Sequence, residues 1–259
     1  MRCPRFCRSL IYRARNTVDN ETYAIKILAH HAAKEEVADR FEREICMMQS
    51  VIHHNIIRVH STGRSGVCPW YAMELIDGKT LDGVLEESPL DTAFFTEVAM
   101  GVATALAAIH EHNIIHRDIK PKNVFACRTG GIKLGNFGVA VDLSSTRLTQ
   151  AGHSVGTPIY MAPEQFDGSK VSTATDIYSF GATMYHAMTG RPPFEASNAM
   201  ELMRRHFTDT AKPISEIRFD IPAAWDHLII DQCMAKQPGD RPQSMQSVIE
   251  SMDALLQGS

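Results

Sequence analysis

The hydrophobic pattern of the chain changes near residue 77, and this change restricts the fold more than any other feature. In residues 21–28, ETYAIKIL, apolar and polar side chains alternate with a period of two, which predicts a strand. Residues 71–76, YAMELI, predict a second strand. Between them, residues 32–51 place four apolar side chains at helical spacing: Val37, Phe41, Ile45 and Met48. The first part of the chain therefore predicts a small sheet with one helix.

Helical patterns dominate the second part of the chain. Apolar side chains recur at helical spacing in four segments, at residues 94–112, 175–190, 224–236 and 244–256. The turn Thr129-Gly130-Gly131 lies between two short apolar segments and predicts a hairpin. We therefore expect an α+β fold with a small β-rich lobe at residues 1–76 and a larger helical lobe at residues 77–259, joined near Asp77.

Composition and charge exclude several classes of protein. The formal net charge of -4 and the pI near 6.3 argue against a general binder of nucleic acid or anionic membranes. No apolar run reaches the ~18 residues of a membrane span, and no apolar segment of signal-peptide length follows the basic N-terminus. We expect a soluble, cytoplasmic protein that contacts neither nucleic acid nor a membrane.

The cysteines and histidines do not predict a metal site. The six cysteines are scattered and form no CxxC pair, which indicates reduced thiols rather than a disulfide framework or a zinc site. The numerous histidines do not suggest metal binding either.

Two charged residues lie on faces that should be buried. Lys26 shares a strand face with its apolar neighbours two residues away, and Glu44 lies within the apolar stripe of the predicted helix. A buried charge is costly unless it is paired. Either Glu44 sits at the edge of the stripe and reaches water, or it pairs with Lys26 across the helix–sheet interface. The pair would hold the lysine amine ready for an anionic ligand.

Residues 114–125, IIHRDIKPKNVF, combine a polar loop with apolar flanks. Asp118, Lys120 and Asn123 supply a proton acceptor, a phosphate-sized cation and an amide oxygen able to bind a metal. The alternative is an ordinary charged surface loop, but such a loop rarely lies between two strongly apolar flanks. We therefore interpret this segment as a candidate catalytic loop.

These features belong to an ordered set of motifs between about Leu10 and Leu255. The set comprises YAIK with Lys26, then Glu44, MELIDG at 73–78, HRDIKPKN at 116–123, APE at 162–164, DIYSFG at 176–181 and DRP with Arg241. In order and spacing, the chain resembles the eukaryotic-type protein kinases, most closely the bacterial serine/threonine kinases. The resemblance implies a two-lobed protein kinase fold, ATP and Mg²⁺ as cofactors, and a protein substrate or docking partner.

The resemblance implies catalytic roles for the polar residues. Lys26 would contact the α/β-phosphates of the nucleotide, and Glu44 would orient it. Asp118 would accept the proton of the substrate hydroxyl, Lys120 would neutralise the moving phosphoryl group, and Asn123 would hold Mg²⁺. A lysine at position 120 is also the family's mark of serine/threonine specificity.

The resemblance also implies nucleotide-binding and structural residues. The adenine pocket would be formed by Ala24, Met73, Glu74 and Ile76, with Met73 guarding it and residues 74–76 offering backbone hydrogen bonds. Glu164 and Arg241 would form a structural ion pair. Asp176 would brace the catalytic loop from the start of its helix, and His116 would pack in the core.

The chain departs from the family at the metal ligand. The family's DFG aspartate is Asn136 in this chain, within LGNFGVA, so a neutral amide replaces a carboxylate that anchors Mg²⁺. Two unit charges about 4 Å apart interact by about 4 kcal/mol at an effective dielectric near ~20. At about tenfold in rate per ~1.4 kcal/mol, losing that charge would lower activity by several decades.

The second departure is at the front of the chain. The glycine-rich loop of the family would fall at residues 4–9, PRFCRS, which contain no glycine to let backbone N–H groups approach phosphates. No room remains before Pro4 for the usual first strand. We therefore expect the small lobe to lack that strand and to have an uncovered sheet edge. The alternative is that Met1 is a wrongly assigned start or that the gene is truncated.

Two hypotheses for function follow. In the first, the chain is a degenerate kinase or pseudokinase of phospho-signalling that binds Mg-ATP poorly and acts mainly by docking other proteins. In the second, it is a serine/threonine kinase of low activity in which Asn136 and Asn123 together hold one metal ion. We favour the first for the chain as written.

The segment 141–156 predicts regulation by phosphate. Arg117 marks the family subclass that is switched on when an activation-loop phosphate pairs with this arginine, and Thr149 best matches the usual position. Thr157 would line the substrate site and is a further regulatory candidate. We predict that a phosphate on Thr149 orders the segment through charge-assisted hydrogen bonds. Phosphopeptide mapping beside an active partner kinase tests this, and a segment that is never modified would sink the hypothesis.

Overall fold

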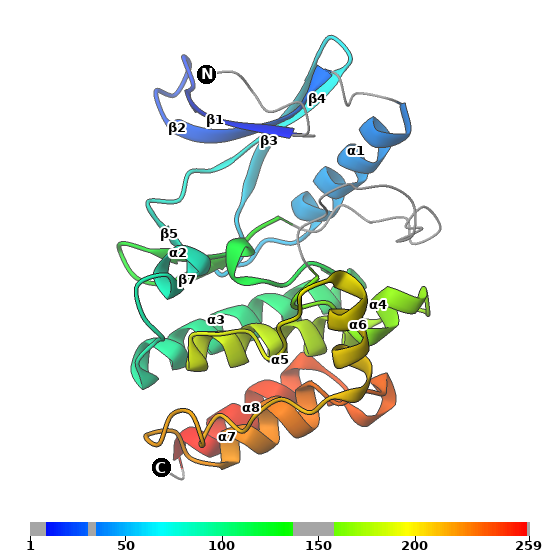
Figure 1. The fold of residues 1–259 in the computed structure, drawn as a ribbon. Coiled ribbons are helices and arrows are strands. Elements are labelled where there is room, and N and C mark those ends of the chain that lie inside the picture. Colours follow the sequence, from blue (N-terminus) through cyan, green and yellow to red (C-terminus); the bar gives the residue numbers. More distant parts are fainter. Residues whose placement is uncertain (1–8, 31–34, 137–157, 258–259) are drawn as a thin grey trace.

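The computed structural model describes residues 9–30, 35–136 and 158–257. The described chain forms a β-rich lobe followed by a larger helical lobe (Figure 1). In the first lobe, an antiparallel sheet has the strand order β1-β2-β4-β3. These strands are β1 (Ser9–Arg15), β2 (Thr22–Leu28), β3 (Val59–Ser65) and β4 (Cys68–Glu74).

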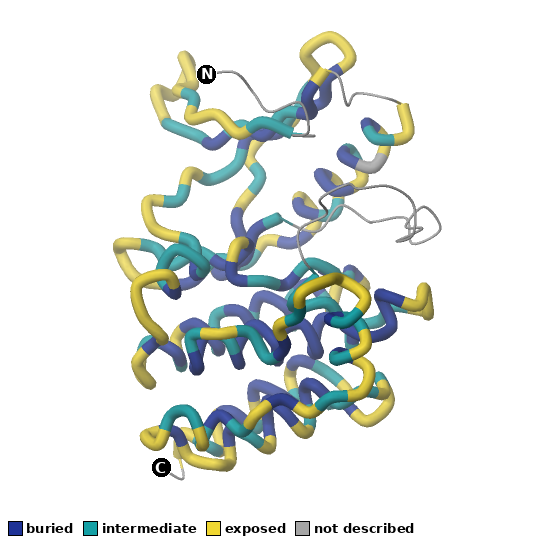
Figure 2. The backbone as a smooth tube through the Cα atoms, in the orientation of Figure 1, coloured by how far each residue is buried: buried dark blue, intermediate teal, exposed yellow. Residues whose placement is uncertain are grey.

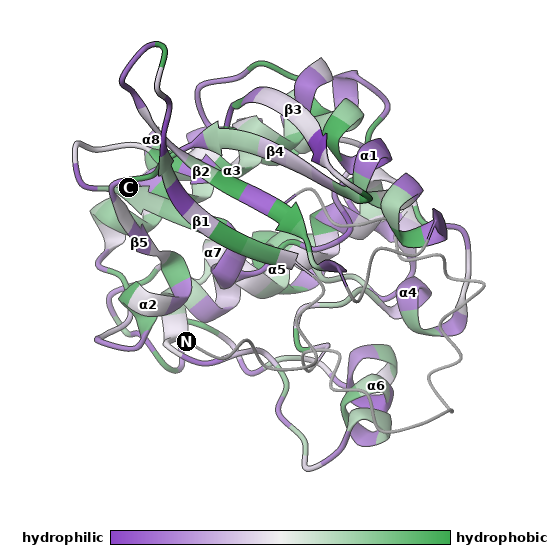
Figure 3. Ribbon diagram, turned by 90° about the horizontal axis from the view of Figure 1, so that it is seen from above, coloured by the Kyte–Doolittle hydropathy of each residue, from purple (hydrophilic) through white to green (hydrophobic). Residues whose placement is uncertain are grey.

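Helix α1 (Glu35–Ser50) packs against β3 and β4, because one face of it is apolar. Both hydrophobic and hydrophilic bands are visible along it in Figure 3, which views the sheet from above. Phe41, Ile45 and Met48 are buried and Val37 is partly buried, as their spacing predicts. Strand β2 likewise buries the alternate residues Ala24 and Leu28, so the predicted helix and the strand predicted at residues 21–28 are confirmed, and β4 contains most of the strand predicted at residues 71–76.

The expected absence of a first strand concerns residues 1–8, which lie outside the described part of the chain. Within the described sheet, β1 is an edge strand beside β2.

A small three-stranded sheet follows the first lobe. Its strands are β5 (Gly78–Thr80), β6 (Val124–Cys127) and β7 (Ile132–Leu134), in the order β5-β6-β7. The predicted hairpin joins β6 to β7, where Gly130 and Gly131 both have a φ of 89°. Gly78 is required at the start of β5, because a Cβ there would collide with the carbonyl oxygen of Ala126.

The second lobe is built around two long helices. Helix α3 (Thr92–Glu111) packs against α5 (Thr173–Thr189), α8 (Met245–Gln257) and β7. Buried segments run along α3 and α5 in Figure 2. Helix α3 is apolar and long enough to span a membrane, but its apolar side chains lie in the core of this lobe.

Shorter elements complete this lobe. They are α2 (Leu81–Leu85), α4 (Pro163–Asp167), α6 (Ala199–Thr208), α7 (Ala224–Asp226), the π-helical turn η3 (His227–Cys233) and the 3-10 turns η2 (Pro121–Asn123) and η4 (Pro238–Asp240). The four predicted helical segments correspond to α3, to α5, to α7 with η3, and to α8. Gly190 ends α5 with a φ of 75°, as a glycine at a helix C-terminus does.

A buried ion pair joins α4 to the segment before α8, as predicted. The guanidinium of Arg241 donates to both carboxylate oxygens of Glu164, at 2.7 and 3.0 Å. Thr175 donates to the same carboxylate, and the remaining guanidinium bonds go to backbone carbonyls. Burial alone would raise the pKa of Glu164, but the hydrogen bonds and charge of Arg241 outweigh it and hold that pKa below its ordinary value.

We predict that Arg241→Met destabilises the protein by about 3–5 kcal/mol, because it leaves the Glu164 carboxylate buried without its partner. Urea unfolding measures the loss. The control is Arg204→Met on α6, whose exposed ion pairs should contribute less than about 1 kcal/mol. A loss of equal size in both variants would contradict the assignment.

The same pair predicts the direction of acid sensitivity. A carboxylate whose folded-state pKa is lowered contributes stability above its unfolded pKa, and this contribution is lost as the pH falls toward the folded value. As the pH is lowered through the acid range, the free energy of unfolding of the wild type should therefore decrease more steeply than that of Arg241→Met.

Candidate functional site

The predicted pair between Lys26 and Glu44 forms between β2 and α1. The ammonium lies 3.1 Å from Glu44 Oε1, and the two residues are 8% and 1% exposed. The alternative in which Glu44 reaches water is therefore wrong. The ammonium also lies 5.6 Å from the ring centroid of Tyr71. Burial raises the pKa of Glu44, and the charge of Lys26 offsets only part of this rise.

The catalytic-loop segment is fixed from below by Asp176, near the start of α5. Its fully buried carboxylate accepts the backbone N–H groups of His116 and Arg117, each at 2.8 Å, and lies 2.9 Å from His110 Nε2. The predicted bracing role of Asp176 is confirmed. His116 is fully buried, as predicted, and its Nε2 lies 3.2 Å from the carbonyl oxygen of Gly135. Burial lowers its pKa, which favours the neutral ring.

The candidate catalytic residues meet around one carboxylate. Lys120 donates to Asp118 Oδ1 at 2.7 Å. The amide of Asn123 donates to the backbone carbonyl of Asp118 at 2.7 Å and to its Oδ2 at 2.9 Å. Asn123 is 3% exposed, whereas the side chain of Asp118 is 42% exposed. The segment is therefore an anchored loop that presents a carboxylate, rather than an ordinary solvated surface loop.

Asn136 joins the two halves of the site. Its Oδ1 accepts a hydrogen bond from Lys26 at 3.3 Å, and its Nδ2 donates to Asn123 Oδ1 at 3.1 Å. Its φ of 51° lies in the left-handed region, which asparagine tolerates better than most residues. A continuous series of hydrogen bonds therefore runs from Glu44 through Lys26, Asn136 and Asn123 to Asp118.

The two predicted metal ligands do not form a site that fits Mg²⁺. Both Asn123 and Asn136 are neutral, whereas Mg²⁺ in proteins is usually held through carboxylates. The Oδ1 of Asn136 faces the Lys26 ammonium, and the Oδ1 of Asn123 faces an amide N–H. Both carboxylate oxygens of Asp118 already accept hydrogen bonds. Among the described residues, no group of three or more His, Cys, Asp or Glu side chains is placed to hold a metal ion.

The predicted adenine-pocket residues lie at one end of β2 and β4. Ala24 and Met73 are directly opposite in the strand register, so they share one face of the sheet. The amide of Glu74 donates to the carbonyl of Arg58 at 2.9 Å, which leaves it no N–H for a base. Ile76 follows β4 in the connection to β5 and is partly exposed. The contact of these residues with adenine stays a prediction.

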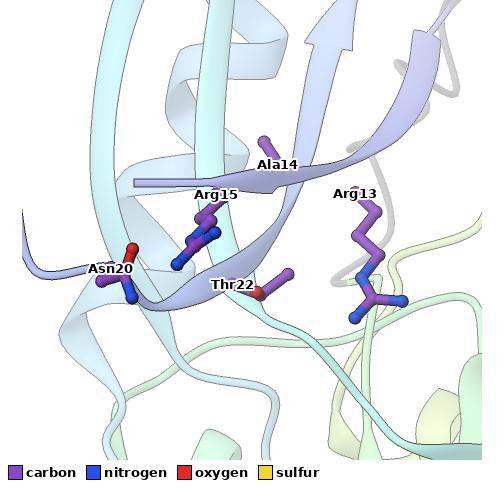
Figure 4. A pocket seen from close by; sticks show the side chains of 5 residues that line it. All are labelled: Arg13, Ala14, Arg15, Asn20 and Thr22. Atoms are coloured by element: carbon purple, nitrogen blue, oxygen red, sulfur yellow. The ribbon is translucent and has the colours of Figure 1, made fainter. Parts of the chain in front are cut away.

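A hollow at the β1–β2 hairpin extends the same face of the sheet (Figure 4). Its lining residues are Arg13, Ala14, Arg15, Asn20 and Thr22. Arg13 lies opposite Ala24 in the register, and Arg15 lies opposite Thr22. None of the predicted site residues lines this hollow.

Asn55 is a site-positioning residue that the sequence analysis missed. Its amide donates to the carbonyl of Ile132 at 2.7 Å, and its own carbonyl accepts the N–H of Leu134. Thr104 on α3 donates to the side-chain oxygen of Asn55. Asn55 therefore fixes β7, the strand that leads to Asn136. The signal was a single polar residue between His54 and two isoleucines.

Gln165 was also missed. Its Oε1 accepts the N–H of Ala162, and its amide donates to the backbone carbonyl of Arg117 at 3.0 Å. It thereby ties α4 to the catalytic loop.

The predicted regulatory residues Thr149 and Thr157 lie outside the described residues. Arg117 has a φ of 66°, and its Nε is buried without a hydrogen-bond partner in the described chain.

Comparison with known proteins shows the class to which this fold and site belong. Residues 8–252 match the family described as the protein kinase domain, so the chain belongs to the protein kinase domain family. Members of this family generally use ATP and Mg²⁺.

The curated relatives include several bacterial serine/threonine kinases. A probable serine/threonine-protein kinase of Clostridium acetobutylicum is 32% identical over 246 residues, which cover 94% of this chain and 37% of the relative. The serine/threonine-protein kinase PkaA of Streptomyces coelicolor is 35% identical over 243 residues, covering 92% and 44%. PknH of Mycobacterium tuberculosis is 33% identical over 233 residues, covering 89% and 37%. The chain thus spans less than half the length of these relatives.

We predict that Asp176→Asn destabilises the protein by about 1–3 kcal/mol, because one backbone N–H of the catalytic loop loses its acceptor and faces an NH₂ group. Urea unfolding measures the loss, and hydrogen exchange should quicken at the amides of His116 and Arg117. The control is Asp253→Asn on the exposed face of α8. Unchanged exchange at those two amides would show that Asp176 does not hold the loop.

Proposed function

We propose that this chain is a serine/threonine protein kinase-like domain whose phosphoryl transfer is impaired. It would act in phospho-signalling in the cytoplasm, chiefly by docking other proteins, with lobes at residues 1–76 and 77–259. The family membership and the bacterial serine/threonine kinases among its relatives support the class.

The observation that carries the proposal is the neutral amide of Asn136 at the centre of the site. It is held between the Lys26 ammonium and the Asn123 amide, and it offers no negative charge to a divalent cation. The resemblance assigns a metal-anchoring carboxylate to this position, and losing its attraction for the metal ion costs several kcal/mol. The glycine-free segment at residues 4–9 supports the same conclusion from the sequence.

A second candidate function is a serine/threonine kinase of low activity. Two observations favour it. The Lys26–Glu44 ion pair is formed, and the partly exposed carboxylate of Asp118 accepts a hydrogen bond from Lys120. These groups would still orient a nucleotide and accept a proton from a substrate hydroxyl. The difference between the two candidates is therefore one of rate.

Transfer of radiolabelled phosphate from ATP to a protein substrate separates the two candidates. We expect the wild type to transfer at least about 100-fold more slowly than Asn136→Asp, because the restored carboxylate would attract the Mg²⁺ that accompanies the phosphates by several kcal/mol. Asp118→Asn should abolish any residual transfer. If the wild type transfers phosphate at an ordinary kinase rate, and Asp118→Asn abolishes that transfer, the proposed impairment of catalysis is wrong. If neither the wild type nor Asn136→Asp transfers phosphate, the impairment includes the front of the chain.

A further inference from the structure

The side-chain amide of Asn136 is better placed to bind a metal-free nucleotide than a nucleotide that carries a metal ion. We propose that the site formed by Lys26, Asn136 and Asn123 binds the nucleoside triphosphate independently of divalent cations, with the Asn136 amide donating directly to a phosphate oxygen. This inference rests on the proposed function, since it concerns the same candidate nucleotide site.

The hydrogen-bond network fixes the orientation of both amides. The Nδ2 of Asn123 donates to Asp118, so its Oδ1 must point toward Asn136. The Nδ2 of Asn136 then faces that oxygen, and its Oδ1 faces the Lys26 ammonium. Turning the Asn136 amide over would place a donor against the ammonium and an acceptor against an acceptor. The arrangement is therefore complete without a cation.

A carboxylate at position 136 would behave differently. Its oxygens can only accept, so one of them would face the Oδ1 of Asn123 with no hydrogen between them. A cation between the two oxygens would satisfy both, and the same cation would separate the carboxylate from the anionic phosphates. With Asn136, the amide N–H already satisfies the Oδ1 of Asn123, so no cation is required there. Because the amide is neutral, no cation is required to separate it from the phosphates either.

Donors remain for a phosphate. In the described chain, hydrogen bonds use two of the three ammonium hydrogens of Lys26 and one of the two N–H groups of Asn136. Both residues can therefore donate one further hydrogen bond. A phosphate oxygen accepts hydrogen bonds and carries the charge that complements Lys26. A divalent cation in the same place would meet an ammonium and an amide N–H, which both repel it.

Calorimetric titration with ATP, in EDTA and again in excess magnesium, tests the proposal on the wild type without any variant. We expect the two dissociation constants to agree within about threefold, because no carboxylate of the wild-type site needs the cation. In Asn136→Asp, binding should be at least about tenfold weaker in EDTA than in magnesium. A charge-matched control is Asn198→Asp, the exposed N-cap of α6, where either residue caps equally well and the wild-type ratio should persist.

Further variants and a melting experiment complete the test. Asn136→Gly, which keeps a residue that tolerates the positive φ, should weaken ATP binding in EDTA by about tenfold, because it removes a donor to a charged acceptor. Magnesium alone should leave the unfolding temperature of the wild type unchanged and raise that of Asn136→Asp.

Two results would overturn the inference: wild-type binding that tightens tenfold or more with magnesium, or a wild type that binds ATP in neither condition. Both are measured by binding, whereas the proposed impairment is measured by phosphate transfer. A magnesium-dependent but inactive wild type would defeat the inference and leave the proposed function standing. An active wild type with cation-independent binding would do the reverse.

Discussion

The site depends first on the buried carboxylate of Asp176. Arg117 has a left-handed backbone, which costs free energy for a residue with a side chain, so the loop needs an external constraint. Asp176 supplies it through two short hydrogen bonds to backbone N–H groups, and bonds to an ionised acceptor are the strong ones. It lies 60 residues after His116, on a helix of the core. The direction in which Asp118 leaves the loop is therefore set by the rigid part of the fold.

Two other anchors bring their residues to the same place. Asn55 ties β7 to α3 and so positions Asn136, which follows that strand. Helix α1 brings Glu44 to Lys26 on the sheet. The hydrogen bonds from Glu44 to Asp118 thus connect four segments: α1, β2, the residues that follow β7, and the catalytic loop. Each segment is held in place by buried contacts of its own. The hydrogen-bond network therefore forms because these segments are already in position, and it does not determine where they lie.

The sequence predicted those features in which a local pattern or a motif assigns a partner. The pair of Lys26 with Glu44 is an example from a pattern, since a charge on an apolar face is costly unless it is paired. The pair of Glu164 with Arg241 is an example from the motifs, since it was implied by the resemblance. Asn55 and Gln165 escaped prediction for a physical reason. Each acts on backbone groups of a distant segment, such as the carbonyl of Ile132, 77 residues away. Every residue has such groups, so no side-chain pattern marks which one is used.

Position 136 shows why an intact set of motifs indicates a fold more strongly than a chemistry. At Glu164 the protein itself supplies the opposite charge, so folding requires the carboxylate. At Asn136 folding requires only a residue of the right size that tolerates a positive φ and can bridge Lys26 and Asn123. Asparagine meets these requirements, and its N–H makes a hydrogen bond that aspartate could not make. A negative charge at this position would be required by a bound ligand alone. Stability and ligand binding are separate constraints at this residue. The fold can therefore be retained while the ligand that the site binds changes.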